Sequence, residues 1–127
     1  MRANGMGLVL LLALLAGCDG TPDRTAMKEA AAITRGDPEA GRALIPRYGC
    51  NACHTIPGIR GSHGDAGPPL AGIVGRMYIA GVLTNTPDHM VRWIQDPPGI
   101  DPKTAMPNLG VSEKEARDIT AYLYSLK

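Results

Sequence analysis

The chain has 127 residues, a formal net charge of +1 and 44% hydrophobic residues. This length allows one small domain, and the near-zero charge argues against nucleic acid as a partner, because proteins that bind it usually carry a basic surplus. The sequence contains no Phe, one Trp and four Tyr, so aromatic side chains add little bulk to a core that is marginal at this size. The 3 cysteines cannot all pair in disulfides, and 16 Gly and 11 Pro indicate long loops. Something other than side chains is therefore expected to fill the centre.

The N-terminal residues are typical of an export signal. Arg2 precedes an apolar run over residues 8–16, which is too short to span about 30 Å of hydrocarbon. The run ends in Leu-Ala-Gly-Cys, which resembles the lipoprotein box of bacteria, where the cysteine takes a diacylglycerol; here it is Cys18. We expect a signal peptide over residues 1–17 and a lipid on Cys18 that holds the protein on the inner membrane, facing the periplasm. The alternative is an ordinary signal peptide with Cys18 as a stray thiol.

The next segment has few large apolar groups. Residues 19–36 are small and polar and include no aromatic side chain, so we expect residues 18–36 to form a lipidated, flexible tether. A folded domain is expected over residues 37–127. No internal repeat is visible.

Three helices are predicted within this domain, each from a start signal. Asp37 followed by a proline predicts the first, which Pro46 should kink or shorten. The second is predicted from Thr86 to about Gln95, where Asp-Pro-Pro-Gly follows. The third opens with a capping box at Ser112 and carries an apolar stripe. Since no convincing alternating strand pattern appears, the sequence predicts an all-α domain of three main helices with long loops.

The strongest motif is Cys50-Asn-Ala-Cys53-His54, the pattern of c-type haem attachment. Two thiols at this spacing can each add to one haem vinyl group, and the following histidine can reach the iron. A thioredoxin-like pair would need a βαβ context that is missing here. A zinc site would need a further ligand, for which His63 and His89 are candidates, but neither lies in a ligand-like pair.

From Gly41 to its end the chain resembles class I cytochromes c. The resemblance depends on the order and spacing of Gly41-Arg42-Ala43-Leu44, the motif Cys50 to His54, the segment GPPLAGIVGR over residues 67–76, Met106-Pro107 and Ala121-Tyr122-Leu123. Residues 55–58 and 78–83 are similar to a bacterial subgroup whose members occur alone or fused to a subunit of haem–copper oxidases. The resemblance implies a small all-α fold around one covalently bound haem. Ile45 and Pro46 depart from the family pattern, which affects the expected length of the first helix.

The same resemblance implies the two ligands of the haem iron. His54 would be the proximal ligand, with its other ring nitrogen donating to the carbonyl of Pro68. Met106 would be the distal ligand, since it lies in a loop and precedes a proline. The alternative for Met106 is a core residue, and Met77 and Met90 are rival ligands.

Further residues match positions around the haem. Arg76 matches a position near a haem propionate, and Tyr78 could hydrogen-bond to one as well. Trp93 aligns with an aromatic position that lines the haem face on the methionine side, although plain core packing would also explain it. With a lipid on Cys18 and thioethers at Cys50 and Cys53, no free thiol and no disulfide would remain.

A haem iron with His and Met ligands has no open position, so the resemblance implies an electron carrier and not an enzyme, without a small-molecule substrate. Met/His ligation also raises the reduction potential. The expected partners are redox proteins at the membrane, such as a terminal oxidase or a quinol-oxidising complex. A haem-based gas-binding or sensor module with a labile sixth ligand is the alternative.

Overall fold

The computed structural model describes residues 20–127, so the predicted signal peptide and Cys18 lie outside the described residues. The chain forms six helices, one turn of 3-10 helix and two short strands within this part. In order they are α1 (Arg24–Thr34), α2 (Pro38–Arg47), α3 (Cys50–Cys53), η1 (Ile73–Gly75), β1 (Tyr78–Ile79), β2 (Leu83–Thr84), α4 (Pro87–Gln95), α5 (Pro97–Ile100) and α6 (Glu113–Ser125). The predicted all-α class is confirmed, and the three expected main helices are α2, α4 and α6.

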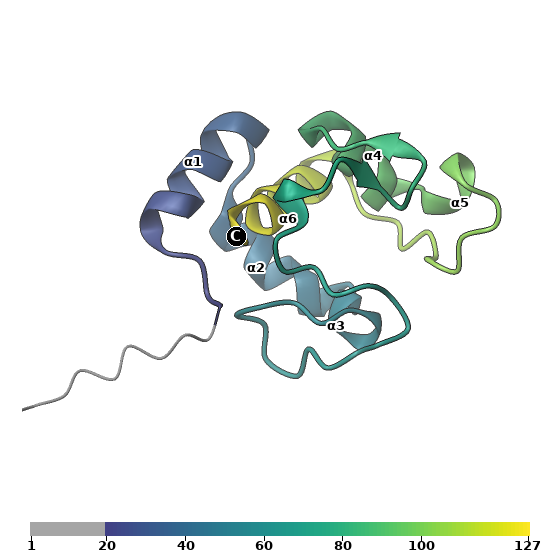
Figure 1. Cartoon of the computed structure of the whole chain (residues 1–127), viewed down its shortest axis with the longest axis horizontal. Coiled ribbons are helices and arrows are strands. Elements are labelled where there is room, and N and C mark those ends of the chain that lie inside the picture. Colours follow the sequence, from purple (N-terminus) through teal and green to yellow (C-terminus); the bar gives the residue numbers. More distant parts are fainter. Residues whose placement is uncertain (1–19) are drawn as a thin grey trace, which may run out of the picture.

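The C-terminal helix α6 forms the centre of the fold. Helices α1, α2 and α4 all pack against it (Figure 1). Every residue from Asp118 to Ser125 is buried as a result. This arrangement leaves the helix no fully solvated face over its last two turns.

The crossing of α2 and α6 is close because Gly41 has no side chain. A Cβ on Gly41 would lie 2.5 Å from the carbonyl carbon of Asp118 and 2.9 Å from the nitrogen of Ile119. A hydrogen bond from the Tyr48 hydroxyl to Glu115 Oε2, 2.7 Å long, joins the end of α2 to the start of α6. The two helices are thus in backbone contact along one side of the core.

Local signals set the ends of these helices as expected. The Asp37 carboxylate accepts hydrogen bonds from two backbone N–H groups of the first turn of α2, and Thr86 caps α4 in the same way. Ser112 and Glu115 form the predicted capping box of α6. Helix α2 ends one residue beyond Pro46, in keeping with the expected shortening.

The N-terminal segment differs from the flexible tether expected over residues 18–36. Residues 24–34 form helix α1, which packs on α6 and buries Ala26, Ala30 and Thr34. Asp23 caps the helix through a hydrogen bond to its carboxylate from the N–H of Ala26, and this bond lowers the pKa of Asp23. The tether prediction is wrong here because small residues, and not large apolar ones, form the buried face.

A short antiparallel hairpin is the second feature that the sequence did not indicate. Tyr78 pairs with Thr84 and Ile79 with Leu83. Its turn includes Ala80 and a glycine with positive φ angles. With two residues in each strand, the hairpin is too short to show an alternating pattern.

Candidate functional site

The Cys-x-x-Cys-His motif forms one turn of helix and the extended residue after it. Helix α3 begins after Gly49, whose φ of 74° suits a glycine, and Cys50 and Cys53 lie at its two ends. Three positions apart, their side chains share one side of the helix. His54 leaves the helix in an extended conformation, which directs its ring away from α3.

The two thiols differ in exposure. Cys50 is half-buried, Cys53 is exposed, and neither forms a disulfide among the described residues. Burial raises the pKa of the Cys50 thiol, so this group stays protonated at neutral pH. The site therefore brings two cysteine sulfurs onto one turn of helix, next to a histidine.

The ring of His54 is held in one orientation. Its Nδ1 donates to the carbonyl oxygen of Pro68 at 2.8 Å, the contact expected from the sequence. A carbonyl only accepts hydrogen bonds, so in the neutral ring Nε2 carries the free lone pair. Gly67 lies against the ring, where a Cβ would lie 2.6 Å from Nδ1 and 2.9 Å from Nε2. Only glycine leaves the ring room in this position.

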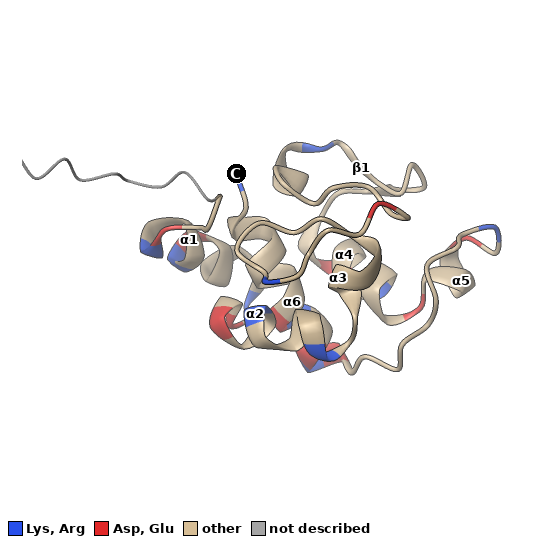
Figure 2. Ribbon diagram, turned by 90° about the horizontal axis from the view of Figure 1, so that it is seen from below, with Lys and Arg blue, Asp and Glu red and all other residues tan. Residues whose placement is uncertain are grey.

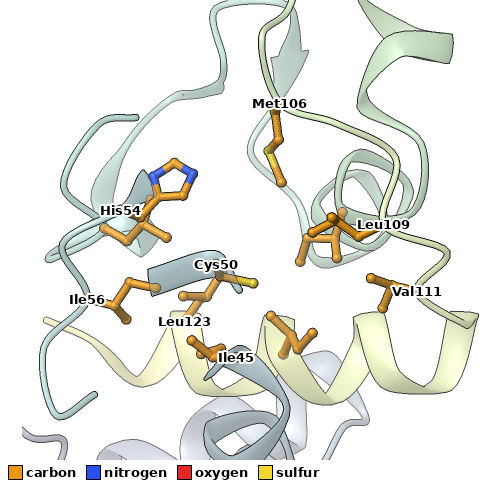
Figure 3. Close-up of a pocket in the computed structure, with 11 residues that line it drawn as sticks. Ile45, Cys50, His54, Ile56, Met106, Leu109, Val111 and Leu123 are labelled. Atoms are coloured by element: carbon orange, nitrogen blue, oxygen red, sulfur yellow. The ribbon is translucent and has the colours of Figure 1, made fainter. Parts of the chain in front are cut away.

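Met106 lies across a cavity from His54. It is half-buried in the loop between α5 and α6, and its backbone N–H donates to the Thr104 hydroxyl at 3.2 Å. The side chain of Asn108 anchors the same loop to Asp96 at 3.1 Å. Figure 3 shows the thioether of Met106 and the ring of His54 on two sides of one space, with Cys50 below them.

The walls of this cavity are aliphatic. Apart from Cys50, His54 and Met106, every lining residue is a branched hydrophobic one: Ile45, Ile56, Leu70, Ile94, Leu109, Val111, Ile119 and Leu123. The cavity between these side chains has a volume of about 40 Å³.

These residues fit a haem. Imidazole nitrogen and thioether sulfur are both known axial ligands of haem iron, and the aliphatic walls suit a flat, largely apolar ring. The absence of a side chain at Gly67 leaves room for the His54 imidazole beside the cavity. Among residues 20–127, no group of three or more His, Cys, Asp or Glu side chains lies close enough to hold a metal ion.

The structure does not bring every predicted site residue to the cavity. Trp93 is buried, but the adjacent Ile94 lines the cavity instead. Tyr78 is exposed on β1, and the Arg76 guanidinium donates to the carbonyl of Pro69. None of these three predicted haem contacts is visible in the lining, and Cys53 also lies outside it.

Sequence reasoning missed Asn85, which supports one side of the site. Its amide donates to the carbonyl oxygens of Ile73 at 2.8 Å and Arg76 at 2.9 Å, and its Oδ1 accepts from the Tyr124 hydroxyl at 2.6 Å. This network ties the segment after Leu70 to α6. An asparagine between a hairpin and a helix carries no signal by which the sequence could have indicated this role.

Comparison with known proteins finds one family whose model covers the motif, the cavity and the C-terminal helix. The model of the cytochrome c family matches residues 38–127. Cytochrome c2 of Rhodopila globiformis is 35% identical over 105 residues, which cover 72% of this chain and 95% of that protein. No solved structure gives a significant match.

Two oxidase subunits are also similar. Cytochrome c oxidase subunit 2 of Alkalihalophilus pseudofirmus is 33% identical over 88 residues, which cover 68% of this chain and 25% of that subunit. The same subunit of Bacillus sp. strain PS3 is 30% identical over 97 residues, covering 72% of this chain and 27% of that subunit. The chain thus spans about a quarter of the length of these two relatives. No helix in residues 20–127 has the length and apolar character needed to cross a membrane.

Proposed function

The chain belongs to the cytochrome c family, and on this premise we propose that it is a membrane-tethered monohaem carrier of single electrons between respiratory redox partners. Members of this family transfer electrons through a covalently bound haem c. The match over residues 38–127 supports the same cofactor here, attached through the two cysteines of the Cys50–His54 motif.

In this proposal Cys50 and Cys53 form the thioethers, and His54 and Met106 are the iron ligands. The observation that carries it is the position of the His54 ring and the Met106 thioether on two sides of one aliphatic cavity (Figure 3). When bound, haem supplies a one-electron couple at its iron. The hydrogen bond from His54 to Pro68 fixes the orientation of the ring.

Hydrogen bonds within the loop that carries Met106 and from this loop to Asp96 support a ligand that stays in place. The Thr104 hydroxyl accepts from the backbone of Met106, and Asn108 is bonded to Asp96. Two permanent ligands leave no open position for a substrate and need little rearrangement when the charge changes. An electron carrier, and not an enzyme, follows from such a site.

We further propose that the carrier delivers electrons to a terminal oxidase. Support comes from the similarity to subunit 2 of two cytochrome c oxidases, proteins that this chain covers only in part. A lipid on Cys18 would hold the carrier on the periplasmic face of the inner membrane and raise its effective concentration near membrane-bound partners. One acylated cysteine with several chains gives a stable anchor.

Two measurements test the cofactor and its ligation. A pyridine haemochrome spectrum and the intact mass should give one haem c per chain, together with the acyl groups on Cys18. The ferrous protein should bind CO slowly or not at all, because Met106 occupies the sixth position. Rapid CO binding by the unaltered protein would favour a gas-binding or sensor module and contradict the carrier.

Oxygen uptake tests the proposed partner. Reduced protein is added to membranes that contain a cytochrome c oxidase, and O₂ consumption is followed with and without it. The proposal predicts faster consumption that stops when the oxidase is inhibited. Unchanged consumption would refute the oxidase as acceptor and leave the electron-carrier assignment intact.

A further inference from the structure

The segment ahead of the cytochrome c domain is fixed to it along its length. Helix α1 buries Ala26, Ala30 and Thr34, and the guanidinium of Arg117 donates to the carbonyl of Thr34 at 3.2 Å. Ion pairs join this segment to the domain from the middle of the helix and from its C-terminal end: Glu29 with Lys127 at 3.7 Å and Arg35 with Asp88 at 3.9 Å. Residues 24–35 therefore move with the domain.

The contact continues to the first described residue. A Cβ on Gly20 would lie 3.0 Å from the Cβ of Pro57, and a Cβ on Gly58 would lie 3.4 Å from the Thr21 hydroxyl oxygen. Residues 20 and 21 thus lie against the turn at Pro57 and Gly58. Figure 1 shows α1 running from this point along the edge of the domain.

This contact limits where an anchor on Cys18 can be. Two residues of extended chain span at most about 7 Å, so Cys18 lies within that reach of Gly20. Gly20 itself lies on the Pro57 turn. A lipid on Cys18 would therefore enter the bilayer beside this turn, and the domain could not swing on a long linker.

The surface next to the turn carries positive charge suited to a lipid headgroup. Arg42 and Arg60 line an open hollow with Gly58, and Glu39 is the acidic residue in the same lining. Arg42 donates to the Gly58 carbonyl at 3.4 Å, which keeps its guanidinium beside the turn. Figure 2 shows basic positions on α1, together with acidic ones. Arginine side chains next to a bilayer surface are attracted to anionic lipid headgroups.

We propose that this face, made of the Pro57–Arg60 turn, Arg42 and the start of α1, lies on the anionic membrane surface and sets the orientation of the domain. The inference rests on the proposed lipid at Cys18. Ile56 precedes the turn and lines the haem cavity, and His54 is three residues from Pro57. The histidine side of the cavity is then the side nearer the bilayer, and the loop with Met106 faces away from it.

Paramagnetic broadening measures this orientation directly. The lipidated, reduced holoprotein is placed in nanodiscs of phosphatidylethanolamine and phosphatidylglycerol that contain a lipid with a nitroxide on its headgroup. Amide signals of residues 58–61 should lose the most intensity, and those of the non-proline residues within 101–110, in the loop before α6, the least. Uniform broadening, or the greatest loss in residues 101–110, would overturn the proposal.

Two sets of variants separate the docked helix from the charges. Ala30→Glu places a charge on the buried face of α1 and should make the broadening uniform, whereas Ala32→Glu on its exposed face should not. The double variant Arg42→Gln with Arg60→Gln should show a weaker gradient of broadening. Each arginine is expected to increase partition of the domain onto the anionic membrane surface about fivefold. Arg92→Gln, on the exposed side of α4, is the matched control. If the gradient of broadening is unchanged both in Ala30→Glu and in the arginine double variant, the assigned face is refuted.

The intact mass of the same sample distinguishes failure of the anchor from failure of the orientation. A mass without acyl groups refutes the lipid on Cys18, and the orientation with it. An acylated mass together with uniform broadening refutes the orientation alone. The absorption spectrum of each variant reports whether the haem site is unchanged.

Discussion

Replacing Gly41 by alanine tests how closely α2 and α6 must approach to form the core around the cavity. In an exposed helix the change would stabilise the protein by about 1 kcal/mol, because alanine has the higher helix propensity. Here the new Cβ would lie 2.5 Å from the carbonyl carbon of Asp118, so the helices would have to separate by about 1 Å to reach ordinary contact. A gap of that size forfeits about half of the dispersion energy of the atoms that line it.

Overpacking of this kind costs about 1–3 kcal/mol, and rigid backbone atoms on the partner helix put Gly41 at the upper end. After the gain in helix propensity, we expect Gly41→Ala to lower the free energy of unfolding by about 2 kcal/mol. The melting temperature should fall by about 8–16 °C for a domain of this size.

Guanidinium unfolding of the holoprotein, followed by circular dichroism, measures the effect. Ala43→Gly is the matched control, because Ala43 is exposed on the same helix and should cost only about 1 kcal/mol by propensity. If Gly41→Ala proves as stable as the unaltered protein, or more so, the close crossing of α2 and α6 is wrong.

Three further predictions concern the site and its surroundings. Met106→Ala should open the iron, so that the ferrous protein binds CO rapidly by flash photolysis, whereas Met77→Ala, at an exposed position, should behave like the unaltered protein. Burial raises the pKa of Tyr124 to about 12, so stability should be complete below pH 10 and fall as the pH rises toward 12. In unfolding curves measured at alkaline pH, Tyr124→Phe should lose less stability between pH 10 and 12 than the unaltered protein. An equal loss in both proteins would refute Tyr124 as its source. A chain without haem, made as Cys50→Ala with Cys53→Ala, should be largely unfolded by circular dichroism; a cooperative, native-like apo form would contradict this.

The main helices could be predicted because their ends depend on local chemistry. A side-chain cap at Asp37, Thr86 or Ser112 acts on backbone groups within three residues, so it can be read from a short window. Helix α1 has a cap of the same kind at Asp23, but its packing on the domain could not be predicted from a short window. Its buried face consists of Ala26, Ala30 and Thr34, and its position depends on the surface of α6, which lies far away in the sequence.

The residues of the site also differ in whether a local sequence signal could predict them. Thioether formation and iron ligation admit few residue types, so Cys50, Cys53, His54 and Met106 stand out in the sequence. Half of the aliphatic cavity wall has no such signal, because four of its eight residues lie in loops without periodic pattern: Ile56, Leu70, Leu109 and Val111.

Trp93 and Ile94 show what the sequence leaves open on a helix, namely which of two adjacent buried residues faces the cavity. Adjacent residues point about 100° apart, and both side chains are buried. The sequence alone could not decide which of them faces the cavity, and the structure selects Ile94. The family resemblance, and not a local rule, favours the aromatic residue.

The central claim is that one haem is held between His54 and Met106. Proton NMR of the reduced holoprotein tests it most directly, because a methionine methyl group bound to haem iron lies over the ring and its signal is displaced far from those of other methionines. We predict one such signal, which disappears in Met106→Ala and persists in Met77→Ala and Met90→Ala. A displaced signal that survives in Met106→Ala, or none in the unaltered protein, would contradict the account.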